Sequence, residues 1–223
     1  MSNRVIAIDG PSASGKSTVA RLVAARLGWL YVDSGSVYRG ITWQALRAAC
    51  EPSRPAEIAA CLQRMKFEFF VTGGAVRFRI NGGDPGQELR SETVSERVSE
   101  VSAIPEVRAA ATAWLRDMRG LGSLVMEGRD IGTVVFPNAA FKFYLDASAE
   151  ERARRRSFEL EAGRGTGDVA RVRAAIERRD QKDRGRPNAP LRVADGATVI
   201  DTTGLSVDAV VARIAQMIGR MES

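Results

Sequence analysis

Short apolar runs alternate along the chain with longer segments in which apolar residues recur every three or four positions. Five runs have the length and composition of buried strands, at residues 5–9, 29–33, 124–127, 141–146 and 198–201. After the first run, Val19, Leu22 and Val23 share one helical face, and Gly28 then supplies a stop. Strands that alternate with helices predict an α/β fold with a five-stranded parallel sheet.

The middle of the chain departs from this alternation. Residues 67–71 and 76–80 alternate apolar and polar positions on either side of Gly73-Gly74, which is typical of a β-hairpin. We therefore expect a small β insertion, covering about residues 66–90.

Apolar and hydroxyl residues occupy different faces of the helix expected after Ser91. One face can pack against the core while the other offers hydroxyl groups. The two stripes are Val94, Val98 and Val101, and Ser95, Ser99 and Ser102. Pro105 ends this helix and opens the next one.

Composition limits the class of protein. The 223 residues are 44% hydrophobic, enough for a substantial core, and no apolar run approaches the roughly 18 residues of a membrane span. The first strand begins too early for a signal peptide, so we expect a cytoplasmic protein. Cys50 and Cys61 lack the spacing of a metal or redox pair and are expected to be free thiols.

The net charge of +6 comes mainly from arginine, whose planar fork suits phosphate groups. The arginine-rich segments have almost no interleaved aromatic residues, which argues against a nucleic-acid partner. Because the chain has no histidine, mechanisms that need imidazole are excluded.

The loop after the first strand fits the pattern G-x-x-x-x-G-K-S. In such a P-loop the backbone amides bind phosphates, the lysine reaches the terminal phosphates, and the Ser/Thr hydroxyl meets Mg²⁺. The following helix adds its N-terminal dipole to the anion site. The expected phosphate-binding residues are Gly10, Pro11, Ser12, Ala13, Ser14, Gly15, Lys16, Ser17 and Thr18, with Ser17 as the metal ligand.

Polar residues follow two further strands. Asp33, Ser34 and Arg39 come after the second, and Gly128-Arg129-Asp130 come after the third. The carboxyl ends of parallel strands share one edge of a sheet, so a second substrate is expected there.

Two arginine-rich helices follow the fourth strand. Arg152 and Arg156 are like charges four residues apart, which is unfavourable unless an anion lies between them. Arg179, Asp183 and Arg186 share one face. A P-loop combined with such arginines indicates phosphoryl transfer, which depends on positioning and charge neutralisation.

Several motifs together resemble bacterial cytidylate kinases. They are Asp9-Gly10-Pro11 before the P-loop, Asp33-Ser34-Gly35 with Tyr38-Arg39, the run from Glu127 to Pro137, and Arg179-Asp180-x-x-Asp183-x-x-Arg186. The resemblance covers nearly the whole chain. It implies a three-layer P-loop fold with a core (residues 1–35, 121–147 and 188–223), a monophosphate-binding region (36–120) and a helical lid (about 148–187).

The same resemblance implies transfer of the ATP γ-phosphoryl group to CMP or dCMP, with Mg²⁺, by a monomer. Arg39 and Arg129, with Ser34 beside them, would hold the CMP phosphate. Ser99, Arg108 and Asp130 would read the cytosine, and Asp183 and Arg186 would reach the ribose. Arg152, Arg156, Arg179 and Lys182 would serve the ATP phosphates, with Lys16, Arg129, Arg156 and Arg179 taking part in catalysis.

Two positions depart from the family pattern, since Leu115 stands where glutamine is usual and Glu127 stands where aspartate is commoner. Other P-loop kinases, for adenylate, thymidylate or shikimate, remain alternatives. So does a regulatory GTPase or a nucleic-acid-binding ATPase, although the Asp201-Thr-Thr-Gly204 sequence has no N-K-x-D motif to accompany it.

Overall fold

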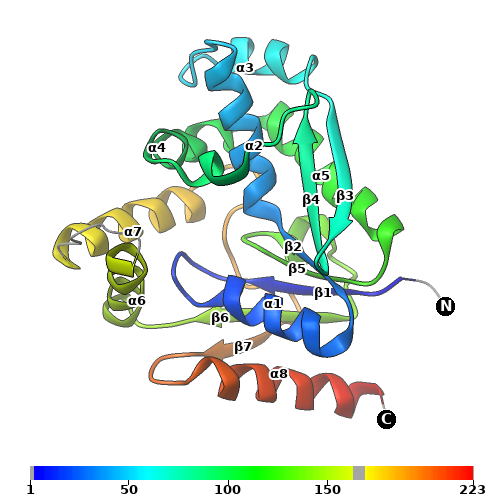
Figure 1. Ribbon diagram of the computed structural model, residues 1–223. Helices are drawn as coiled ribbons and strands as arrows, with labels where there is room; N and C mark the ends of the chain where they lie inside the picture. The colour runs from blue at the N-terminus through cyan, green and yellow to red at the C-terminus, as the bar shows by residue number, and fades with distance from the viewer. Residues whose placement is uncertain (1–2, 163–168, 223) are drawn as a thin grey trace.

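A single sheet runs through the computed structural model, which describes residues 3–162 and 169–222. Its strands are β1 (Val5–Asp9), β2 (Leu30–Asp33), β3 (Phe67–Thr72), β4 (Ala75–Ile80), β5 (Leu124–Gly128), β6 (Phe141–Asp146) and β7 (Thr198–Asp201). They lie in the order β3-β4-β2-β5-β1-β6-β7 (Figure 1).

The five strands expected from the apolar runs are all present and pair in parallel. The expected number of strands in the sheet was wrong, because the β3–β4 hairpin joins its edge and gives seven. β4 meets β2 through one residue pair, Tyr31 with Ala75, and the Tyr31 amide donates to the Gly74 carbonyl oxygen at 2.9 Å. Such a short contact between distant segments leaves no trace in a local pattern.

Helices connect the strands. They are α1 (Lys16–Leu27), α2 (Ser34–Arg47), α3 (Pro55–Leu62), α4 (Glu92–Val101), α5 (Pro105–Asp117), α6 (Ala149–Ala162), α7 (Val169–Arg184) and α8 (Val207–Glu222). Three shorter turns are η1 (Gly86–Arg90), η2 (Met118–Leu121) and η3 (Ile131–Val135), of which η3 is a π-turn.

Side chains alternate along the central strands between two cores. On β1, Val5 and Ala7 pack with residues of α2, α4 and α5, whereas Ile6 and Ile8 pack with residues of α1 and α8. Because both faces of the sheet are covered, its central strands are apolar at nearly every position. The result is helix, sheet and helix in three layers (Figure 1).

The strand register brings the polar strand ends to one edge of the sheet. β5 lies between β1 and β2, with Gly128 opposite Asp9 and Glu127 opposite Asp33. α6 and α7 pack side by side beyond this edge, and α7 also contacts α4 (Figure 1). No described helix is long and apolar enough to cross a membrane.

Candidate active site

Two glycines shape the loop between β1 and α1. A Cβ atom on Gly10 would lie 2.1 Å from the carbonyl oxygen of Leu145, and Gly15 has a φ of 86° at the N-cap of α1. Larger residues are therefore unfavourable at both positions. No side chain among the described residues caps α1, which leaves its first amides for an anion.

Lys16 is buried beside this loop, with 6% of its surface exposed. Its Nζ atom donates a hydrogen bond to the Pro11 carbonyl oxygen at 3.0 Å. Burial lowers the pKa of Lys16 to about 7, and the positive charges of Arg129 and Arg179 act in the same direction. The ammonium group is thus costly to hold there until a negative charge accompanies it.

Two oxygen ligands lie together beside Lys16: the hydroxyl of Ser17, the next residue, and the carboxylate of Glu127 from β5. The Ser17 hydroxyl donates to Glu127 Oε1 at 2.6 Å, and only 4% of Glu127 is exposed. Hydroxyl and carboxylate oxygens are the donor types that Mg²⁺ prefers, so this pair fits such an ion.

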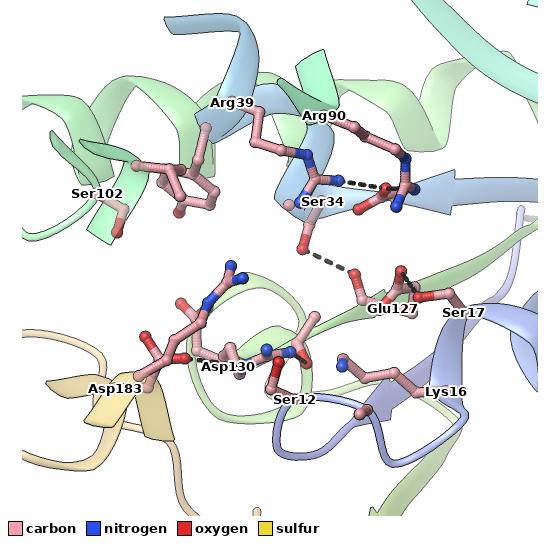
Figure 2. A pocket seen from close by; sticks show the side chains of 18 of the residues that line it. Ser12, Lys16, Ser17, Ser34, Arg39, Arg90, Ser102, Glu127, Asp130 and Asp183 are labelled. Atoms are coloured by element: carbon pink, nitrogen blue, oxygen red, sulfur yellow. Dashed lines mark hydrogen bonds and ion pairs between the residues drawn. The ribbon is translucent and has the colours of Figure 1, made fainter. Parts of the chain in front are cut away.

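Asp33 organises the opposite wall of the cavity. Its carboxylate accepts from the Ser36 amide as the N-cap of α2, and it pairs with Arg39 at 2.6 Å and with Arg90 at 3.6 Å. Burial alone would raise the pKa of Asp33, but the two arginines, the Ser36 amide and Lys16 together more than offset it and the pKa is lowered. Figure 2 shows Arg39 and Arg90 across the cavity from Lys16.

A buried ion pair is part of the cavity wall. Arg108 and Asp130 are 5% and 3% exposed, and their charged groups meet at 2.5 Å. Arg108 also donates to the Ser102 carbonyl oxygen at 3.2 Å, and its guanidinium lies 5.1 Å from the centre of the Tyr38 ring. These contacts fix donor and acceptor groups that can read the edge of a base.

α7 contributes a second carboxylate that holds arginines. Asp183 accepts from Arg129 Nε at 2.9 Å and lies 3.7 Å from Arg186. One turn earlier, Arg179 also lines the cavity, and burial followed by the Arg129 charge lowers its pKa to about 10.

These walls enclose a cavity of about 430 Å³ lined by nine basic and four acidic side chains. The acids pair with only some of the basic groups, so the cavity keeps an excess of positive charge. A site of this kind favours polyanionic ligands, and phosphate groups match both the loop amides and the arginine forks.

Comparison with known proteins identifies the family. The family model described as cytidylate kinase matches residues 6–220. The chain belongs to the cytidylate kinase family. The enzyme is 41% identical over 218 residues to the cytidylate kinase of Geobacter sulfurreducens, covering 98% of this chain and 94% of that protein. The cytidylate kinase of Lactiplantibacillus plantarum is 42% identical over 219 residues, with 98% and 96% covered.

Solved structures support the fold alone. A protein from Eubacterium ventriosum, titled as uncharacterized, superposes with a TM-score of 0.54 at 11% identity, covering 97% of this chain and 99% of that one. A gluconokinase from Sinorhizobium meliloti 1021 gives a TM-score of 0.50 at 10% identity, with 99% and 94% covered.

Most site residues expected from the sequence line this one cavity. From the P-loop they are Ser12, Ala13, Gly15, Lys16, Ser17 and Thr18, and from elsewhere Ser34, Arg39, Arg108, Arg129, Asp130, Arg156, Arg179, Asp183 and Arg186. Gly10, Pro11 and Ser14 belong to the loop but are not among the lining residues.

Three further predicted residues do not line the cavity. Lys182 is exposed, and Ser99 is half-buried with its carbonyl oxygen accepting from the Ser102 hydroxyl. Arg152 is buried and pairs with Asp180, so the anion expected beside it is supplied by the protein. Their ligand contacts stay predictions.

Sequence reasoning missed some lining residues. Ser102 lies on the predicted hydroxyl stripe and lines the cavity, whereas the resemblance indicated Ser99 of the same stripe. Arg90 ends η1, at the end of the expected β insertion, and reaches Asp33 by a turn that no sequence pattern indicated. Arg21 and Val98 also line the cavity, but in the sequence they showed only helical spacing, which did not indicate a place in the site.

Proposed function

We propose that the enzyme transfers the γ-phosphoryl group of ATP to CMP or dCMP in the presence of Mg²⁺, forming ADP and CDP or dCDP. One observation carries this proposal: a single cavity joins Lys16 of the P-loop to the buried Arg108–Asp130 pair. The first element suits a polyphosphate, and the second suits a base.

The P-loop side is proposed to bind the donor. The amides at the start of α1 and the Lys16 ammonium would hold the ATP phosphates. Ser17 and Glu127 would hold Mg²⁺, which neutralises phosphate charge when bound. Among the described residues no group of three acidic or cysteine side chains could hold a metal alone, and Mg²⁺ commonly relies on few carboxylates plus substrate phosphates.

Arg39 and Arg129 are proposed to bind the phosphate of the acceptor, with Ser34 beside them. An oxygen of this phosphate attacks the γ-phosphorus of ATP, and the bond from that phosphorus to the β–γ bridging oxygen breaks. A phosphate monoester has a second pKa of about 6, so its attacking oxygen is already deprotonated at pH 7. The absence of histidine from the chain therefore removes nothing that the reaction needs.

Cytosine is proposed to be read by Arg108 and Asp130. The Asp130 carboxylate can accept from the exocyclic amino group of cytosine, where uracil has an acceptor oxygen instead. Mispairing that leaves a buried polar group unsatisfied discriminates strongly between similar bases. Asp183 and Arg186 are proposed to contact the ribose, and Ser99 is proposed to contact the base.

Arg156 and Arg179 are proposed to neutralise charge on the transferred group from α6 and α7. With Arg152 and Lys182 they would form a lid over about residues 148–187, of which residues 163–168 lie outside the described part. The division into core, monophosphate-binding region and lid, the monomeric state and a cytoplasmic location all stay predictions.

A panel of monophosphates tests the proposal. ADP formation is measured with CMP, dCMP, UMP, AMP and dTMP, and with shikimate as a small-metabolite control. CMP and dCMP should give the highest kcat/KM, and equal use of UMP would contradict the proposed reading of cytosine. Omission of Mg²⁺ should abolish transfer, and undiminished turnover without it would contradict the donor site.

A further inference from the structure

The π-turn η3 directly follows two residues of the proposed acceptor site, Arg129 and Asp130. The amides of Val134 and Val135 donate to the Asp130 carbonyl oxygen at 2.9 and 3.1 Å. π-turns are rare and are frequent at functional sites. The turn is therefore bonded to the backbone of Asp130 itself, next to Arg129.

Asp9 holds the first end of η3. Its Oδ1 atom accepts from the Ile131 amide at 2.9 Å, and its Oδ2 atom accepts from the Gly132 amide at 2.7 Å. Only 3% of Asp9 is exposed, and both carboxylate oxygens are used for this turn. A Cβ atom on Gly132 would crowd Asp9 Oδ2 at 3.3 Å and Lys142 Cδ at 3.2 Å, which explains the glycine.

Arg116 holds the other end. From α5, its Nε atom donates to the Val135 carbonyl oxygen at 2.9 Å, and its second guanidinium nitrogen donates to the Val134 carbonyl oxygen at 2.8 Å. A carboxylate at the amide end and a guanidinium at the carbonyl end both match the dipole of the turn. The two charge-assisted hydrogen bonds from Arg116 also fix the geometry of the turn.

Neither Asp9 nor Arg116 lines the cavity, so neither is placed to touch a substrate. We propose that they are positioning residues, a clamp that grips η3 at both ends and thereby aims Arg129 and Asp130 at the acceptor. The clamp rests on the proposed acceptor site. Its function is to preorganise the arginine, because even a small misplacement of a binding group reduces turnover.

Arg116→Gln is the decisive variant, since Arg116 is exposed and its loss should leave the fold intact. The expected result is a KM for CMP raised by about tenfold, with the KM for ATP changed by less than about twofold. The matched control is Arg119→Gln. Arg119 is exposed as well and donates to a backbone oxygen, that of Asn3 at 2.7 Å, and among the described residues it makes no hydrogen bond to η3.

Asp9→Asn supplies an independent test. The asparagine side chain has one acceptor oxygen, whereas the backbone N–H groups of Ile131 and Gly132 are bound by two. It should raise the KM for CMP in the same selective way. Equal changes in the KM values for CMP and ATP, or equal effects of Arg116→Gln and Arg119→Gln, would overturn the clamp.

Comparison with Arg129→Ala separates this inference from the proposed function. If the clamp acts through Arg129, adding Arg116→Gln to Arg129→Ala should change the KM for CMP much less than it does in the wild type. Full additivity would show a purely structural role and would contradict the clamp. If Arg129→Ala itself leaves the KM for CMP unchanged, the proposed acceptor site fails instead.

Discussion

Replacing Lys16 with methionine should stabilise the free enzyme while abolishing its function. Lys16 is buried, its ammonium group donates a hydrogen bond to the Pro11 carbonyl oxygen, and burial together with Arg129 and Arg179 lowers its pKa from 10.5 to about 7. At about 1.4 kcal/mol per pKa unit, this difference makes the charged lysine cost up to about 5 kcal/mol below pH 7. Methionine fills a similar space without charge.

The pH dependence follows from the sign of the pKa change. The folded-state pKa of about 7 lies below the unfolded value of 10.5, so unfolding takes up a proton between these two pH values. The stability of the wild type should therefore rise with pH across this window, relative to the variant. The advantage of Lys16→Met should be largest at pH 6 and should shrink by about 3 kcal/mol at pH 9.5.

Urea denaturation at pH 6 and pH 9.5, without nucleotide, measures this difference. The control is Lys142→Met, because the Lys142 ammonium donates to a proline carbonyl oxygen at 2.9 Å in a half-buried setting. The difference in stability between Lys142→Met and the wild type should change little between the two pH values. If Lys16→Met is less stable than the wild type at pH 6, or if its advantage does not change with pH, the reasoning from burial is refuted.

Three further predictions concern other parts of the site. Asp130→Asn should lower kcat/KM for CMP by at least about tenfold and narrow its ratio to that for UMP, measured by ADP formation; an unchanged ratio would remove Asp130 from base recognition. Gly10→Ala forces a Cβ atom to within 2.1 Å of the Leu145 carbonyl oxygen, so thermal-shift assays should lose the stabilisation by ATP. Arg152→Met leaves the buried Asp180 carboxylate with the Ser12 amide but without its arginine partner, which should cost about 3–5 kcal/mol in urea denaturation. Adding Asp180→Leu should recover part of this loss, and a further loss would contradict the explanation.

The strands and their polar ends could be predicted from the sequence because both depend on local patterns. Apolar runs marked all five parallel strands, and the strand ends identified residues such as Ser34 and Arg129 that line the cavity. The contact of the hairpin with β2 could not be predicted. It depends on Tyr31 and Ala75, which come together only in the folded sheet.

Two site residues show why helical periodicity alone was not enough. The family resemblance indicated Ser99, which shares the hydroxyl stripe with Ser102; α4 ends at Val101, and Ser102 just beyond this end lines the cavity. The spacing of Arg152 and Arg156 predicted an anion between them, and the local sequence indicated only a ligand phosphate as that anion. The carboxylate of Asp180 comes from the next helix, 28 residues later, and meets Arg152 through tertiary packing.

Charge compensation differs between the two sides of the cavity. On the proposed acceptor side, Arg39 pairs with Asp33, and Asp183 holds Arg129. On the proposed donor side, the pKa values of Lys16 and Arg179 are both lowered by burial and then by the charge of Arg129.

Carboxylates that hold arginines in place reduce the reorganisation needed when a phosphate binds. On the donor side, where fewer carboxylates accompany the basic groups, the positive charges repel one another until a ligand with several negative charges binds. This difference in charge compensation matches the two substrates, because the ATP polyphosphate carries more negative charge than the single phosphate of CMP. The donor should therefore gain more from relief of repulsion, and the acceptor more from groups already fixed in position.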